Sequence, residues 1–486
     1  MLNKFESKHP IIYLVVVAFI FGFITILSCS CITSFLYPQM SGYVYYNDAL
    51  VFCELGKSMV QGYKPYVDIF DHKGLYIFYY TAIGGILGIK GVMIVQVLLI
   101  SIVFAFIYKS LKIYTNDKLL IFSALFFFGA LYAFTGQTPN DCDLELPFIT
   151  IMIYFYLLGI KDNDYKKFMY GNIALGIATG IAFNLRMSDA LVPFAFVCFY
   201  AYKSIKDKQV KYIFRDAGIV IGLILLMSIP PFVHAYFGGF FDDMVQSVYL
   251  NNFKYITTTG MRRDGVPMVA YILLPIIAGL FILLTILKRK ELTIDDRIFI
   301  FVTMGVSFLV ELVIAFYPHY LIVLYSYLVI ILGRLISLYV KTEENKARKP
   351  IFIGLASIFV ISLFFNPTIY AVNYQKDMNT INYINNTVTD EDKDGHILIF
   401  GPPALYELTG IRINYGDFTC QTNHVLISER YSTENLIKFL NSEECHYYMV
   451  SPVNSIFLDT VEFDRASYEL VPTDLNVSVT IYHHII

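Results

Sequence analysis

The sequence predicts a polytopic α-helical membrane protein with about eleven transmembrane helices and a C-terminal α/β domain outside the membrane. The 486-residue chain is 57% hydrophobic and only 15% charged, whereas soluble domains are roughly a quarter charged. Long uncharged windows recur up to residue 365, and the composition becomes mixed after residue 367. The formal net charge of −3 is too small to indicate a nucleic-acid partner.

The transmembrane windows are assigned by length, because about 20 apolar residues in a helix cross the hydrocarbon core of a bilayer. The first window is too long for the core of a signal peptide and lacks a small-residue cleavage site, so we expect it to remain as an anchor. The predicted spans are 11–36, 91–108, 119–138, 146–160, 171–185, 190–202, 217–237, 266–287, 299–317, 320–336 and 351–365.

One further apolar segment, residues 74–88, is short and rich in glycine. Short cytoplasmic loops collect Lys and Arg, so the loops that hold most of the basic residues should share the cytoplasmic side with the basic N-terminal segment. If residues 74–88 crossed the membrane, the N-terminus would lie on the opposite side from those loops. We therefore predict an interfacial or re-entrant helix within a long first external loop, 37–90, and a cytoplasmic N-terminus. The basic loops are 109–118, 161–167, 203–215, 288–297 and 341–349.

The C-terminal region, residues 368–486, has the pattern of a small α/β domain, and residues 1–367 form the membrane module. Residues 396–400 and 446–450 are short apolar runs typical of buried strands. A Gly-Pro-Pro turn and a helix ending near Gly410 follow the first strand, and an amphipathic helix at 432–441 precedes the second. Strands that alternate with helices favour an α/β domain. The predicted topology places this domain on the external side.

The first external loop combines acidic, basic and tyrosine side chains between residues 43 and 73. Asp48 precedes a window, 49–60, whose apolar positions suit a helix on the membrane surface with Asp48 as its N-cap. An N-cap role alone would explain Asp48. A second group of carboxylates on the same side of the membrane favours a catalytic role instead.

That second group stands in the next external loop, directly before the span that begins at residue 146. It consists of Asp141, Asp143 and Glu145. Acids at the N-terminus of a helix are favoured by the helix dipole, which is the simpler explanation. Three acids so close to lipid are nevertheless costly unless they are hydrated, paired or used. Asp143 and Glu145 are therefore candidate catalytic residues.

Basic residues on the external side indicate an anionic ligand. A single external Lys or Arg is usually an anchor at the membrane interface. Several such residues, in a protein that otherwise keeps its basic residues on the other side, favour binding of a lipid phosphate. The candidates are Lys73 at the end of the first loop, Arg186, Arg262, Arg263 and His319.

Two stretches of sequence carry a family resemblance. The first loop contains GYKPYVD at 62–68 and DHKG at 71–74, and YPHY stands at 317–320. With an N-terminal helix and the early Asp48, the chain resembles the GT-C membrane glycosyltransferases. The likeness is to the bacterial branch similar to protein O-mannosyltransferases and aminoarabinose transferases. It covers roughly residues 11–160 by motif and the whole chain by topology.

The chain departs from that family pattern at two places. The family usually has two prolines after the lysine of the first loop, where this chain has Gly74 and Leu75. Its second-loop acid often stands in a Thr-Glu-Glu context, whereas the order here is Asp-Cys-Asp-Leu-Glu. The equivalent carboxylate is therefore open between Asp143 and Glu145, with Asp143 as the first choice.

The resemblance implies an inverting glycosyltransferase. Such an enzyme moves a sugar from a polyprenyl-phosphate donor to a glycan, lipid or protein acceptor at the outer face of the cytoplasmic membrane, in cell-envelope glycan assembly or modification. Asp48 would act as general base on the acceptor hydroxyl. Lys73, Arg186 or His319 would hold the leaving phosphate, so that no cofactor and no obligatory metal is expected. Asp143 or Glu145 would orient the acceptor or assist the base.

Two other functions and a metal site stay open. A flippase for lipid-linked oligosaccharides would carry charges along its helices, whereas the acids here stand in external loops. A polysaccharide polymerase would share the lipid donor, but would usually place its main catalytic loop late in the chain. Asp68, Asp71 and His72 are close enough in sequence for a metal site, although ordinary surface residues explain them as well.

Overall fold

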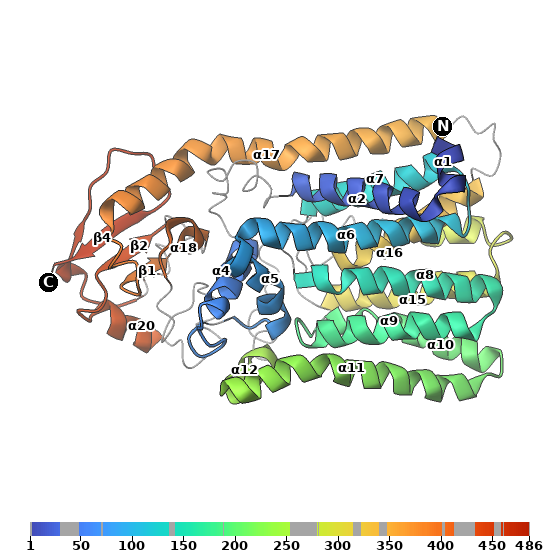
Figure 1. The fold of residues 1–486 in the computed structure, drawn as a ribbon, viewed down its shortest axis with the longest axis horizontal. Coiled ribbons are helices and arrows are strands. Elements are labelled where there is room, and N and C mark those ends of the chain that lie inside the picture. The colour runs from blue at the N-terminus through green and yellow to red at the C-terminus, as the bar shows by residue number, and fades with distance from the viewer. Residues whose placement is uncertain are drawn as a thin grey trace.

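The computed structural model places α-helices over most of the chain and one small sheet near its C-terminus (Figure 1). It describes residues 2–29, 48–69, 71–135, 141–187, 189–252, 279, 281–313, 322–339, 348–400, 404–412, 433–451, 458–459 and 461–485.

Long apolar helices lie side by side and form a bundle (Figure 1). Such helices suit a lipid environment, because every backbone polar group is satisfied within the helix. The predicted spans overlap these helices, except 266–287, which lies largely outside the described residues. The helices are α2 (Pro10–Ser28), α6 (Ile89–Lys112), α7 (Lys118–Thr135), α8 (Leu146–Asp162), α9 (Tyr165–Phe183), α10 (Phe194–Lys206), α11 (Val210–Gly238), α15 (Ile294–Val313), α16 (Ile322–Tyr339) and α17 (Arg348–Thr387).

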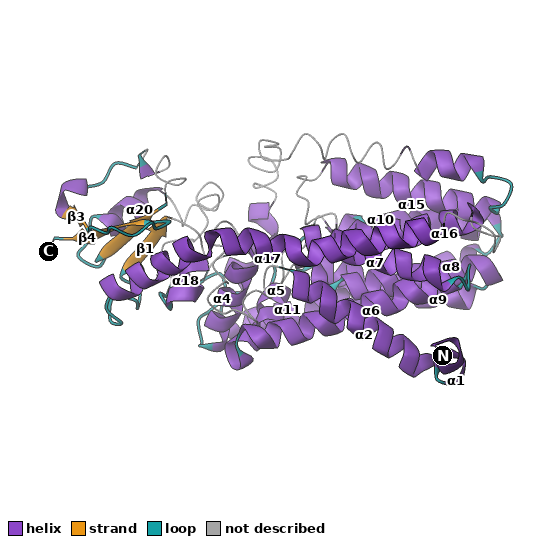
Figure 2. Ribbon diagram, turned by 90° about the horizontal axis from the view of Figure 1, so that it is seen from above, coloured by secondary structure: helices purple, strands orange, loops and turns teal. Residues whose placement is uncertain are grey.

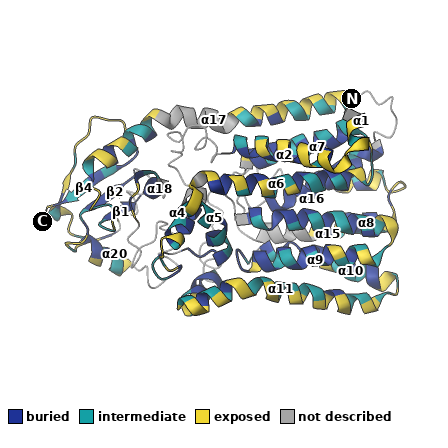
Figure 3. Cartoon of the chain, viewed as in Figure 1, coloured by how far each residue is buried: buried dark blue, intermediate teal, exposed yellow. Residues whose placement is uncertain are grey.

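Several of these helices have the length and composition of membrane spans. Among the described residues, four segments meet both criteria: Pro10–Ser28, Lys90–Lys112, Cys142–Asp162 and Val210–Gly238. The outer face of α11 is exposed along its length (Figure 3), and large apolar side chains such as Phe214, Leu225 and Phe237 lie on it. Apolar side chains exposed in this number are stable in lipid rather than in water. The chain is therefore a membrane protein.

The links that carry basic residues gather at the end of the bundle where α1 (Leu2–Lys8) lies (Figure 1). Ion pairs join them there: Lys118 contacts Glu6 at 2.7 Å, and Arg348 contacts Asp117 at 3.0 Å. Loops predicted to share one side of the membrane thus share one end of the bundle, as far as the structure describes them. The assignment of that end to the cytoplasm stays a prediction.

Two short helices lie at the opposite end of the bundle (Figure 1). α4 (Asp48–Val60) falls on the predicted surface helix, and α5 (Leu75–Leu87) falls on the segment 74–88. They pack closely, since a Cβ atom at Gly56 would lie 2.4 Å from the backbone of Thr81. The 13 residues of α5 extend about 20 Å. This length is shorter than a hydrocarbon core of about 30 Å and agrees with an interfacial or re-entrant helix, which stays a prediction.

The C-terminal sheet lies beyond α4 and α5 (Figure 2). Its strand order is β1-β2-β4-β3. β1 pairs with β2 in parallel, and β4 is antiparallel to both β2 and β3. The two predicted strands are confirmed as β1 and β2, whereas β3 and β4 were not predicted. The strands are β1 (Ile397–Phe400), β2 (Tyr447–Val450), β3 (Tyr468–Leu470) and β4 (Thr480–His484), with helices α18 (Ala404–Thr409) and α20 (Thr433–Leu440).

No break separates the bundle from this sheet. α17 continues through the predicted boundary at residue 367 and carries the chain to the sheet as one 40-residue helix. Val51 and Phe52 of α4, together with Leu405 of α18 and Ile397 of β1, belong to one buried hydrophobic cluster. The C-terminal domain therefore shares a core with the first loop and does not hang from a linker.

A partly buried carboxylate holds the turn that leads into β1. The Asp392 carboxylate accepts a hydrogen bond from the Thr389 hydroxyl at 2.6 Å and lies 2.6 Å from Nδ1 of His446. Burial raises the pKa of Asp392, but the hydrogen bonds from Thr389 and His446 outweigh burial and leave the pKa below its usual value. A lowered pKa in the folded state means that the ionised carboxylate stabilises the fold.

We predict that Asp392→Asn destabilises the protein by about 1 kcal/mol at pH 7. The stabilisation is complete above the unfolded pKa of about 3.9 and disappears as the pH falls through the lower folded pKa. Thermal unfolding of the two proteins should therefore converge below about pH 4. Asp390→Asn is the matched control, because the Asp390 side chain is fully exposed. Equal losses from both substitutions would contradict the prediction.

Candidate active site

Three segments that are far apart in the sequence come together at the end of the bundle that faces the C-terminal sheet (Figure 1). They are residues 71–74 between α4 and α5, residues 141–145 before α8, and residues 184–189 between α9 and α10. Each carries charged side chains that the sequence marked as candidates. All three belong to the external side of the predicted topology.

The first and third segments are joined by a backbone contact. The N–H of Gly74 donates to the carbonyl oxygen of Leu185 at 2.9 Å. A Cβ atom at Gly74 would lie only 1.6 Å from the carbonyl oxygen of Asn184, so this approach requires glycine. The contact places Lys73, which precedes Gly74, beside the segment that carries Arg186.

Lys73 belongs to a buried polar turn. Asp71, His72 and Lys73 are only 1%, 9% and 6% exposed. Asp71 accepts a hydrogen bond from the backbone N–H of Lys73 at 2.8 Å, and the Lys73 ammonium lies 3.4 Å from Nε2 of His72. The backbone of the turn is also held, since Tyr66 donates to the carbonyl of Lys73 and Asn252 donates to that of His72, both at 2.8 Å. Lys73 is therefore a buried cation on a fixed backbone.

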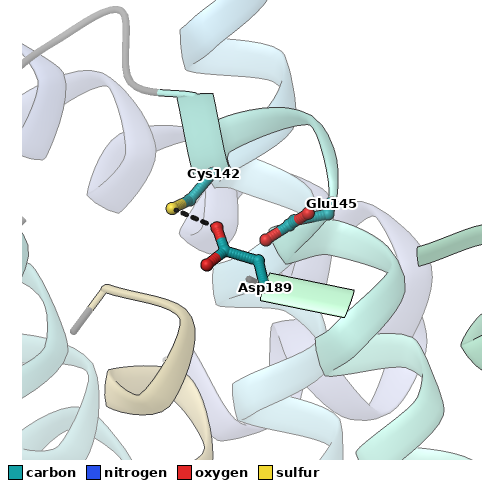
Figure 4. A group of neighbouring side chains, drawn as sticks. All are labelled: Cys142, Glu145 and Asp189. Atoms are coloured by element: carbon teal, nitrogen blue, oxygen red, sulfur yellow. Dashed lines mark hydrogen bonds between the residues drawn. The ribbon is translucent and has the colours of Figure 1, made fainter. Parts of the chain in front are cut away.

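Arg186 is the second buried cation, at 8% exposure. It forms an ion pair with Asp189, which opens the short helix η3 (Asp189–Leu191). Cys142 lies between them, with Sγ 3.8 Å from Nη2 of Arg186 and 3.5 Å from Oδ2 of Asp189. Glu145, directly before α8, completes the group and is also buried (Figure 4).

The side chains of Cys142, Glu145 and Asp189 could hold a metal ion by their spacing. One ligand atom from each lies within 4.8 Å of the others. A thiolate with two carboxylates is a donor set that Zn²⁺ accepts. The Arg186 guanidinium already pairs with Asp189, however, so a metal would compete with it for that carboxylate. Ion pairing by Arg186 explains the cluster equally well.

Asp143 lies in the short helix η2 (Asp141–Leu144) and is completely buried. Tyr132 donates a hydrogen bond to Oδ1 at 2.6 Å, and Tyr80 and Gln96 each donate to Oδ2 at 3.1 Å. The three donors come from α7, α5 and α6. The Asp143 carboxylate thus ties η2 to three helices and fixes the segment that carries Glu145.

For the other predicted site residues, the structure describes only part of their positions or none. Asp48 is the first residue of α4, one position inside the helix from its predicted N-cap position, and its side chain lies outside the described part. Arg262, Arg263 and His319 lie outside the described residues. The Asp68 carboxylate accepts a hydrogen bond from the backbone N–H of Lys64, four residues earlier, at 2.7 Å. This bond closes a local turn.

Several members of this site were not among the residues predicted from the sequence. Asp189 carries a signal that could have been used, because it stands three residues after Arg186 and is opposite in charge. Tyr80, Gln96 and Tyr132, which hold Asp143, carry no such signal. Each lies in an apolar stretch, and only the packing of the helices reveals what it contacts.

Comparisons with known proteins agree with the sequence-based resemblance. Residues 75–232 match the model of the dolichyl-phosphate-mannose-protein mannosyltransferase family. The matched range begins directly after Gly74 and includes η2, Arg186 and most of α11. No sequence among curated proteins matches the chain.

Two solved structures share the fold. They are ArnT from Cupriavidus metallidurans in the apo state, with a TM-score of 0.61, and the same protein bound to undecaprenyl phosphate, with a TM-score of 0.60. Each is 12% identical in sequence, and each alignment covers 98% of both chains. The similarity therefore includes the bundle, the short helices α4 and α5 and the C-terminal sheet. The family match over residues 75–232 and the shared fold both agree with the resemblance to the GT-C membrane glycosyltransferases that the sequence motifs carry.

Proposed function

We propose that this protein is an inverting glycosyltransferase that moves a sugar from a polyprenyl-phosphate donor to an acceptor at the outer face of the cytoplasmic membrane. The observation that carries the proposal is the backbone contact between the segments of Lys73 and Arg186 at one end of the bundle. The side chains of both residues are buried, and each has a carboxylate in its own segment. Two buried cations on segments that are in backbone contact suit a phosphate group.

The comparisons support the same substrate class. The family matched by residues 75–232 is described by its use of dolichyl-phosphate-mannose, and one of the structures with the same fold holds undecaprenyl phosphate. Both compounds carry a phosphate on a long isoprenoid chain. We infer that the donor of this chain has the same design. The acceptor would be a glycan, lipid or protein of the cell envelope.

The reaction is a single displacement at the anomeric carbon of the sugar. The acceptor oxygen attacks C1, its proton passes to a carboxylate, and the bond between C1 and the phosphate oxygen breaks with its electron pair on the phosphate. Lys73 and Arg186 stabilise the charge that develops on the leaving phosphate. Attack from the face opposite the phosphate inverts the configuration at C1.

Asp48 is the proposed general base. It begins α4, which packs against α5, and α5 directly follows the turn that carries Lys73. Its carboxylate takes the acceptor proton as the new bond forms. Glu145 would orient the acceptor. The three hydrogen bonds to Asp143 suit a group that positions η2, so we now propose Glu145 ahead of Asp143 for contact with substrate.

Asp48→Asn should lower kcat for sugar transfer by about 100-fold or more, because the amide cannot accept the proton. The measurement is product formation by purified protein with a panel of synthetic polyprenyl-phosphate sugars. Asp68→Asn is the matched control in the same loop and should retain activity, because Asp68 caps a turn. Full activity of Asp48→Asn would move the base to another carboxylate.

Lys73→Met should raise KM for the donor by about tenfold or more, because a charged hydrogen bond to the phosphate is lost. Initial rates over a range of donor concentrations give this value. Lys57→Met is the control, since Lys57 lies on α4, where it contacts Glu54 at 3.4 Å and is 31% exposed. A donor KM that does not change in Lys73→Met would refute its assignment to the phosphate.

Gly74→Ala should separate the two cations. The added Cβ would meet the carbonyl of Asn184 at 1.6 Å, so the backbone contact to Leu185 must open. We expect a loss of about 1–3 kcal/mol in stability together with a raised donor KM. Thermal unfolding and initial rates test this. Gly218→Ala is the control, because a Cβ there meets nothing within 4 Å. Similar behaviour of both variants would contradict the prediction.

A further inference from the structure

α11 contains two consecutive prolines, Pro230 and Pro231, and they interrupt its hydrogen bonding close to the candidate site. Proline has no backbone N–H, so the carbonyl four residues earlier has no donor from within the helix. For Pro231 that carbonyl belongs to Met227. The hydroxyl of Tyr76, in the first turn of α5, donates to this oxygen at 2.6 Å.

The Tyr76 bond fixes the start of α5 against α11. Gly74 precedes α5 as its N-cap residue, and Lys73 precedes Gly74. The bond between Tyr76 and Met227 therefore holds α5 only three residues from the Lys73 cation. It is a connection between parts of the chain that are 151 residues apart in sequence.

The next residue of α11 holds the other cation segment. Ser228 Oγ accepts a hydrogen bond from Nδ2 of Asn184 at 2.8 Å, and Asn184 Oδ1 accepts one from Tyr249 at 2.8 Å. Asn184 stands two residues before Arg186. α9 and α11 are in contact at this level, since a Cβ at Gly180 would lie 2.7 Å from Cβ of Met227.

We propose that the turn of α11 at Met227 and Ser228 sets the relative position of Lys73 and Arg186, and that Tyr76 is a positioning residue for the donor phosphate. This turn receives one hydrogen bond from Tyr76, three residues after Lys73, and one from Asn184, two residues before Arg186. The carbonyl that receives the Tyr76 bond is available because of Pro231. The inference rests on the proposed function, since it assumes that the two cations bind the phosphate.

A purely structural role for Tyr76 makes a different prediction. In that case the hydroxyl serves only to satisfy the carbonyl that Pro231 leaves without a helical donor. Pro231→Ala would then supply the missing N–H from within α11 and make Tyr76 dispensable. If Tyr76 positions Lys73, the restored helix bond cannot replace it, because α5 would still be unattached to α11 at this point.

The test compares Tyr76→Phe, Pro231→Ala and the double variant with the unchanged full-length protein in detergent. Two quantities are measured: the dissociation constant for a polyprenyl phosphate without sugar, and the midpoint of thermal unfolding. We expect Tyr76→Phe to weaken binding about fivefold or more and to lower the midpoint. In the double variant the midpoint should recover while binding stays weak.

The control is Tyr79→Phe, which removes a hydroxyl 3.0 Å from Nδ1 of His234, a contact between the same two helices. We expect it to leave lipid binding unchanged. Unchanged binding in Tyr76→Phe, or recovery of both quantities in the double variant, would overturn the inference while leaving the proposed function intact. If the unchanged protein bound no polyprenyl phosphate, the proposed function would fail and this inference with it.

Discussion

The arrangement of the candidate site depends on one backbone hydrogen bond, from the N–H of Gly74 to the carbonyl of Leu185. It forms only because Gly74 has no side chain to collide with the carbonyl of Asn184. The family that this chain resembles usually has proline after the loop lysine. Proline could not donate this bond, since it has no N–H. Gly74 is thus a local departure from the family pattern that has a specific structural use here.

This contact brings buried charges together, and their burial must be compensated. Removing an ion from water costs several kcal/mol unless partners surround it. The Lys73 ammonium lies 3.4 Å from the His72 ring, and that ring lies 3.6 Å from the Asp71 carboxylate. Arg186 forms an ion pair with Asp189. Such a site can hold its cations ready for an anion without reorganising when the anion arrives, which is the property that transition-state stabilisation requires.

Much of the fold could be predicted from the sequence, because long apolar runs and short alternating runs are local signals. The helix that begins at Asp48, the short helix within 74–88 and the strands β1 and β2 all followed from such patterns. The placement of the first helix on the membrane surface did not, because Val51, Phe52 and Leu55 are buried against the rest of the protein. The contacts within the site could not be predicted, because Tyr80, Gln96 and Tyr132 approach Asp143 only through tertiary packing. The continuity of α17 was missed for a related reason: its polar second half packs on the C-terminal domain, so its composition changes although the helix does not end.

The most direct test of the central claim is a structure of the protein with a polyprenyl phosphate bound. We expect the phosphate to lie at the contact between Gly74 and Leu185, with its oxygens within about 3 Å of the Lys73 ammonium and the Arg186 guanidinium. A phosphate bound at the opposite end of the bundle, near Glu6 and Lys118, would contradict it. So would a phosphate on the external side that contacts neither Lys73 nor Arg186.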